Sequence, residues 1–251
     1  MNFIIENKIK VAVVAIIIVA IALGIYGAQR STDAGSLSVE TGASEQERQA
    51  DISAIRRFMG DENYSVTFNG ASSPSNFTVG KTTPFPDGGG GRTDVPPEWK
   101  RVVNKYKSVE SVGVRKEIYY FEVDPRTHEV VNAQLDNQQN IEVPPITGEA
   151  PKDDGIFTPR ISESEIRAIG DAYLARAIPD YPSIKSGFTV KPLTKDQGVS
   201  SADRYEWLWQ DTGYKVPEGL DAFPRYPTVR IYISSGGKLL QYNNSVPLFQ
   251  K

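Results

Sequence analysis

A long uncharged run of apolar residues near the start of the chain, Val11 to Tyr26, constrains this protein more than any other feature. A helix of this run is about 24 Å long, and the two small residues after it bring it close to the apolar thickness of a bilayer, about 30 Å. Lys8 and Lys10 precede the run, and such residues tend to stay on the cytoplasmic side of a membrane. We therefore predict a single-pass signal anchor in the cell membrane at residues 11–28. A cytoplasmic tail at residues 1–10 would precede it, and the C-terminal remainder would be extracytoplasmic.

Two other interpretations of this segment remain open. A basic tail followed by an apolar run is also typical of a cleaved signal peptide, and residues 22–24 (ALG) loosely fit a cleavage site. Phe3 and Glu6 ahead of the run are similar to the start of a type IV pilin. However, Asn2 stands where that family has glycine, and lysines interrupt the uncharged stretch that should follow the glutamate.

The composition excludes several classes of function. The chain has 251 residues with a net charge of −3, and its 28 basic and 31 acidic residues are interspersed. Because no basic stripe is present, nothing favours nucleic acid as a partner. The absence of cysteine removes disulfides, thiolate catalysis and cysteine-based zinc sites. We predict neither a cofactor nor a metal site.

The rest of the chain divides into two similar halves. Residues 29–44 are small and polar and indicate a linker, and residues 137–160 are polar and proline-containing and indicate a connection. These two segments delimit a first module at residues 45–136 and a second at residues 161–251. Within the first module, glycines and prolines at residues 70–97 predict one long loop without regular structure.

Each half begins with a helix and continues with antiparallel strands. Ser44 with Glu47, and Ser162 with Glu165, form the sequence pattern of a capping box ahead of an apolar helical stripe. Alternating or β-branched runs predict strands at residues 117–123, 129–135, 188–193, 205–209, 228–233 and 238–242. The predicted fold class is α+β, with an N-terminal transmembrane helix followed by two modules, each a helix packed on a small antiparallel sheet.

The two hairpins also carry a family resemblance. Residues 123–130 (VDPRTHEV) and 233–239 (ISSGGKL) resemble the V-D-x-x-T-G-x-V hairpin of PepSY-type domains, which occur in peptidase propeptides. Residues 161–166 (ISESEI) resemble the I-S-x-x-E-A helix opening of that family, although His128 replaces its glycine and Ser234 its aspartate. The resemblance implies two degenerate copies in a bacterial envelope protein, acting as inhibitory or ligand-binding modules. It brings no catalytic residue with it.

Motifs for catalysis are weak. His128 is the one histidine, and without neighbouring carboxylate or cysteine spacing we expect a solvated turn residue. Residues 80–82 (GKT) lack the earlier glycine of a P-loop, and the prolines that follow forbid its helix. Carboxylate pairs at residues 61–62, 153–154 and 163–165 are expected on the surface. We therefore predict that the chain is not an enzyme.

Aromatic residues supply the best candidate for a binding site. Tyr205, Trp207 and Trp209 alternate along one predicted strand, so their side chains share a face. Tyr214 and Tyr226 follow in a loop rich in glycine and proline. These five residues would make a platform for a peptide or glycan. The alternative is that the aromatic face is the core between helix and sheet.

The predicted function is a membrane-anchored, extracytoplasmic binding or regulatory protein that acts by non-covalent binding of a protein or peptide. A peptidase or another envelope protein is the expected partner. Two alternatives stay open. One is a cell-wall or glycan-processing hydrolase that uses only Asp and Glu, and the other is an accessory subunit of an envelope assembly.

Overall fold

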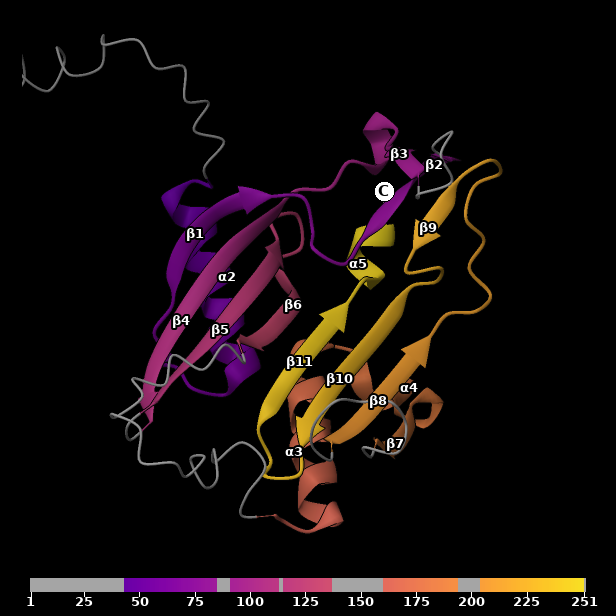
Figure 1. The fold of residues 1–251 in the computed structure, drawn as a ribbon. Helices are drawn as coiled ribbons and strands as arrows, with labels where there is room; N and C mark the ends of the chain where they lie inside the picture. Colours follow the sequence, from indigo (N-terminus) through magenta and orange to yellow (C-terminus); the bar gives the residue numbers. More distant parts are fainter. Residues whose placement is uncertain (1–42, 85–90, 113–114, 137–159, 194–203, 251) are drawn as a thin grey trace, which may run out of the picture. The chain divides into compact units, whose positions relative to one another are not determined.

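The computed structural model describes residues 43–84, 91–112, 115–136, 160–193 and 204–250 (Figure 1). The predicted cytoplasmic tail, the predicted anchor at residues 11–28, nearly all of the linker and nearly all of the connection lie outside these ranges. None of the helices within the described ranges combines the length and the apolar composition needed to cross a bilayer.

Two helices form where the capping boxes predict them. α2 (Glu45–Met59) and α3 (Glu163–Ala177) each follow a serine whose side chain accepts a hydrogen bond from the backbone of the glutamate three residues on. That glutamate accepts in return from the serine backbone N–H, at 2.6 Å for Ser44 and 2.8 Å for Ser162. Gly60 ends α2 with a left-handed φ of 75°, a conformation that costs glycine little.

Eight strands form one antiparallel sheet. In spatial order they are β1 (Thr67–Ser72), β4 (Val103–Val112), β5 (Arg115–Asp124), β6 (Glu129–Asp136), β11 (Leu239–Asn244), β10 (Thr228–Ser234), β8 (Arg204–Gln210) and β7 (Thr189–Leu193). The strands predicted from alternation are confirmed in this sheet. Strands from the N-terminal part of the chain make up one half of the sheet and strands from the C-terminal part make up the other, and they meet at the β6–β11 pair.

A second sheet of three short strands has the order β3 (Gly91–Asp94), β2 (Thr78–Pro84), β9 (Asp221–Phe223). It shows that the prediction of one irregular loop at residues 70–97 is wrong. Pro84 is the last residue of β2, where proline is tolerated, while Val79 near the start of the strand is fully buried. The remaining described elements are the short helices η1 (Pro97–Trp99), α4 (Tyr181–Ile184), η2 (Lys185–Gly187) and α5 (Val246–Phe249).

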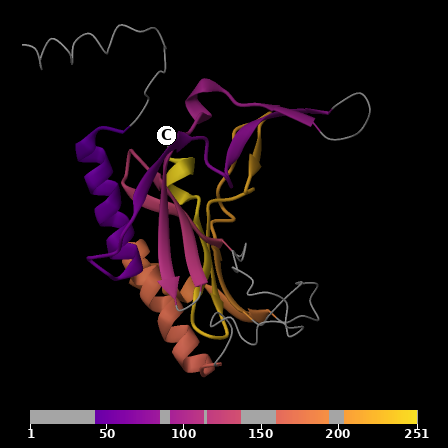
Figure 2. The same cartoon turned by 60° about the vertical axis from the view of Figure 1, so that its left-hand side comes forward.

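Both long helices pack on the same face of the eight-stranded sheet, as Figure 2 shows. Alternate strand residues point at the helices and form the main core together with the buried faces of the helices. The core includes Ile55 of α2 and the strand residues Phe121, Trp207, Ile231 and Tyr242. A second cluster joins the small sheet to the large one and to α5. Its buried members are Phe77, Val79, Trp99, Val103, Val131, Leu248 and Phe249.

The predicted fold class is wrong. The described chain is mostly sheet, and its two halves do not carry separate small sheets, because β6 pairs directly with β11. The opposed residues are Asn132 with Asn243, Ala133 with Tyr242, and Gln134 with Gln241. These partners are more than a hundred positions apart in the sequence, and no local pattern links them. The two predicted modules therefore belong to one compact unit.

Candidate functional site

The face of the large sheet that points away from the helices is polar at its centre. Because side chains alternate along a strand, Asn132 and Gln134 of β6 share this face, and so do their opposed residues Asn243 and Gln241 of β11. We call these four side chains the amide grid. Gln134 and Gln241 make no side-chain hydrogen bond to the described residues.

A groove runs over the amide grid. It consists of two adjoining cavities of about 440 and about 480 Å³, which share Glu122 and Asn132 as lining residues. Apolar side chains border the first cavity, and Phe223 at its rim is 68% exposed. A concave site with a few converging polar groups and an apolar wall is the usual form of a ligand pocket.

Asn132 lies at the junction of the two cavities and carries an unused hydrogen-bond acceptor. Its side chain is only 5% exposed, and its Oδ1 atom has no hydrogen-bond partner in the described part of the chain. Leaving a buried acceptor unpaired costs about 1–3 kcal/mol. A ligand in the groove that brings an N–H or O–H donor to Asn132 would recover that cost.

Two charged side chains that line the first cavity are already paired. Glu122 is 4% exposed and lies 3.4 Å from the Lys105 ammonium. Arg230 lies 3.2 Å from the Glu206 carboxylate through its Nε atom. The floor of the groove is therefore close to neutral, which favours a ligand recognised through hydrogen bonds over one recognised through bulk charge.

The segment before β2 forms one wall of the groove and is fixed to the sheet by side chains. The Ser75 backbone N–H donates to Glu122 Oε2 at 3.1 Å, and the Ser75 hydroxyl donates to Oε1 of the same carboxylate. Asn76 Nδ2 donates to Asn243 Oδ1 at 2.8 Å. One member of the amide grid thus holds the wall in place.

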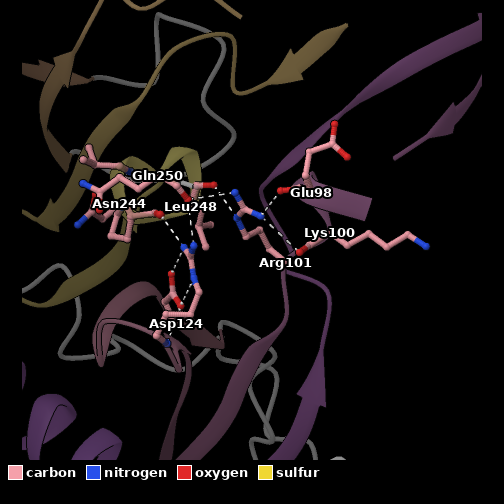
Figure 3. Close-up of polar contacts among 10 residues, drawn as sticks. Glu98, Lys100, Arg101, Asp124, Asn244, Leu248 and Gln250 are labelled. Carbon is pink, nitrogen blue, oxygen red and sulfur yellow. Dashed lines mark hydrogen bonds and ion pairs between the residues drawn. The ribbon is translucent and has the colours of Figure 1, made fainter. Parts of the chain in front are cut away.

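α5 also borders the groove, and two arginines hold it by its backbone carbonyls (Figure 3). Arg101 Nε donates to the carbonyl of Leu248 at 2.9 Å, and Arg126 Nη2 donates to that of Pro247 at 2.8 Å. Both arginines also donate to the carbonyl of Gln250. We call this arrangement the arginine clamp, and it positions Leu248, whose side chain lines the groove.

Asp124 completes the arginine clamp. It is 1% exposed, and its Oδ2 atom accepts from Arg126 Nη2 at 2.7 Å. This hydrogen bond raises the pKa of Arg126, so the guanidinium stays charged. The charge strengthens the hydrogen bonds to the carbonyls of α5, where cations are favoured near a helix C-terminus.

The aromatic residues predicted as a binding platform do not come together at this groove. Trp207 is 1% exposed in the main core, and Tyr205 and Trp209 pack partly buried against the same core. Tyr214 contacts Phe249 of the second cluster, with ring centroids 4.9 Å apart. The Arg225 guanidinium lies over the ring of Tyr226, with 5.4 Å between the Arg225 Cζ atom and the ring centroid. The shared face of β8 therefore points into the core.

His128 is not the simple solvated turn residue expected from the sequence. Its Nδ1 atom lies 2.7 Å from Oδ1 of Asp51, a fully buried carboxylate on α2. Asn104 Nδ2 and the Tyr106 hydroxyl each donate to Asp51 Oδ2 at 2.8 Å. Burial, and then the hydrogen bond to Asp51, raise the pKa of Tyr106, so this phenol remains a donor. His128 has a left-handed φ of 53°, which the contact with Asp51 holds in place.

Comparisons with protein-family models, with curated proteins and with solved structures found no match. The groove must therefore be interpreted from its own chemistry. Sequence reasoning missed it, although a signal existed: Asn132-x-Gln134 and Gln241-x-Asn243 place amides at alternate positions of two predicted strands. Only the pairing of β6 with β11 turns these two short patterns into one surface.

Proposed function

We propose that this protein is a non-enzymatic binding protein that holds an extended peptide in the groove over the amide grid. The observation that carries the proposal is the buried acceptor of Asn132, which has no hydrogen-bond partner among the described residues and lies at the junction of two cavities. A peptide backbone supplies N–H donors that fit this acceptor, and carbonyls that fit the amide N–H groups of its neighbours.

The spacing of the amide grid supports a peptide over other ligands. Asn132 and Gln134 are two positions apart on β6, a separation of about 6.8 Å in an antiparallel strand. An extended peptide repeats its backbone groups with the same two-residue period, so one amide can serve every second residue. Apolar lining residues such as Leu248 and Phe223 can accept the intervening side chains.

Membrane location and partner identity are part of the same proposal. The predicted extracytoplasmic placement and the PepSY resemblance both fit a binding role for a segment of an envelope protein or peptidase. Fractionation of cells that make the full-length chain tests the location. Recovery in the membrane pellet after a high-salt wash is expected, and recovery in the soluble cytosol would contradict the location.

Capture of peptides tests the binding function. The immobilised full-length chain is incubated with randomised decapeptides, and the retained peptides are counted by mass spectrometry. We expect retention, and we expect Asn132→Leu to reduce it by about tenfold, because a backbone donor of the peptide then loses its acceptor. Asn243→Leu should also reduce retention, because Asn76 loses the acceptor that holds the wall of the groove. Asn63→Leu makes the same change at an exposed position outside the groove and serves as the control.

The glycan hydrolase alternative is tested with the same proteins. A soluble N-acetylglucosamine tetramer replaces the peptides, and both its retention and its cleavage are measured. Retention of the tetramer without retention of any peptide would contradict the peptide proposal. Cleavage that disappears in a Glu122→Gln variant would contradict the non-enzymatic part.

A further inference from the structure

We infer that the peptide held in the groove carries a carboxylate and that Arg225 binds it. This inference rests on the proposed function and adds the ligand class that the groove selects. Arg225 follows β9 and lines the same cavity as Asn132. Its side chain is exposed at the rim and makes no ion pair with an acidic group of the described residues.

The other charged side chains that line this cavity form ion pairs, whereas Arg225 forms none with the described residues. Arg230 is paired with Glu206, and Glu122 is paired with Lys105. Among the described residues that line the cavity, Arg225 therefore supplies the charge that a ligand can neutralise. A guanidinium binds a carboxylate through two parallel N–H···O bonds, which is a stronger and more directional contact than a neutral hydrogen bond.

Arg225 is also held in position before a ligand arrives. Its guanidinium stacks over the ring of Tyr226, with 5.4 Å between Cζ and the ring centroid. The Tyr226 carbonyl accepts from Thr228 Oγ1 at 2.8 Å, and the buried Thr228 backbone N–H donates to Ser245 Oγ at 2.9 Å. The rim that carries Arg225 is thus tied to the sheet, which lowers the entropic cost of using it.

Asn132 and Arg225 together define two points of recognition in one cavity. Asn132 requires a donor, which a backbone N–H supplies, and Arg225 requires an anion. An acidic side chain and a free C-terminus present the same carboxylate chemistry, and both satisfy this pair. A peptide with neither would bind through the amide grid alone.

Four randomised decapeptide libraries test the inference against the full-length chain. All omit acidic residues except at one central position, which is either Asp or Asn, and each is made with a C-terminal acid or a C-terminal amide. We expect the wild type to retain carboxylate-bearing libraries about tenfold more strongly than the library without a carboxylate. The library with the increased retention shows whether Arg225 binds the carboxylate of the Asp side chain or that of the C-terminus.

Arg225→Ala should abolish this preference while retaining the carboxylate-free library as the wild type does. Lys215→Ala removes an exposed cation that precedes β9 and does not line the cavity, and it should leave the preference intact. Equal retention of all four libraries by the wild type, or an unchanged preference in Arg225→Ala, overturns the inference and leaves the proposed function standing. Retention of no library by the wild type overturns both.

Discussion

At the scale of single residues, a few buried polar groups determine how this chain holds together. Asp51 is fully buried and accepts hydrogen bonds from β4 while it contacts the turn between β5 and β6. Such a carboxylate links a helix to the sheet through several donors at once. Removing it leaves Asn104 and Tyr106 without their acceptor inside the protein.

Asp51→Ala should therefore destabilise the protein by about 3 kcal/mol, since it breaks a buried charged network and orphans its donors. Urea unfolding of the full-length chain measures the change in the free energy of unfolding. Asp180→Ala is the control, because Asp180 is exposed and its side chain caps no helix. A loss no larger for Asp51→Ala than for the control would contradict this role.

Gly170 in α3 is required by a close approach. A Cβ atom at this position would lie 2.4 Å from Cζ2 of the buried Trp207 ring. Gly170→Ala gains about 1 kcal/mol of helix propensity, but the overlap forces a shift of the core that costs about 1–3 kcal/mol. We expect a lower thermal midpoint for Gly170→Ala. A higher midpoint would show that the helix and the sheet pack less closely than the structure indicates.

Glu129 gives a pH dependence with a definite sign. Burial, reinforced by the Asp124 carboxylate and opposed by Arg57, raises the pKa of Glu129 above its ordinary value of 4.5. When a carboxyl has a higher pKa in the folded state than in the unfolded chain, its ionisation makes the folded state less stable. This loss of stability disappears as the pH falls below the pKa that the carboxyl has in the unfolded chain. Glu129→Gln should raise the thermal midpoint at pH 7.

The advantage of Glu129→Gln over the wild type should shrink as the pH approaches 4. Glu62→Gln, at an exposed position, is the matched control and should give little change at any pH. A Glu129→Gln variant that is less stable than the wild type at pH 7 would contradict the sign derived for Glu129.

At the scale of elements, the arginine clamp makes α5 part of the groove. Arg126→Ala removes donors to Pro247 and Gln250 and leaves Asp124 buried without its cation. Hydrogen exchange should become faster at residues 246–250, and retention of peptides should fall because Leu248 is displaced. Lys100→Ala, which removes a neighbouring exposed cation, should change neither. Unchanged exchange in Arg126→Ala would show that α5 is held by its apolar contacts alone.

Some of the helices and strands could be predicted from the sequence, and others could not. The capping boxes at Ser44 and Ser162 predicted both long helices, because a cap is a local hydrogen-bond pattern. Alternation predicted the hairpins. It failed at residues 70–97, where glycines and prolines hid the short strands β2 and β3. The contact of His128 with Asp51 was also invisible, since these residues are 77 positions apart and meet only in the fold.

At the scale of the whole described chain, one continuous sheet replaces the two predicted small ones. The main core draws residues from both halves, and β6 pairs with β11 at the centre. We expect the described domain to unfold in a single cooperative transition. Tryptophan fluorescence and far-ultraviolet circular dichroism should give coincident urea curves, because Trp99 and Trp207 report different clusters of one unit. Two separated transitions would favour independent modules.

Photo-crosslinking locates a bound peptide on the protein, and it therefore tests the proposal that the groove over the amide grid binds an extended peptide. Retained decapeptides that carry one benzophenone side chain are irradiated on the full-length chain, and the attachment sites are mapped by mass spectrometry. We expect crosslinks on β6, β11 and the segment around Phe223, and we expect their loss in Asn132→Leu. Crosslinks on the outer surfaces of α2 and α3 that persist in Asn132→Leu would contradict binding of the peptide in the groove.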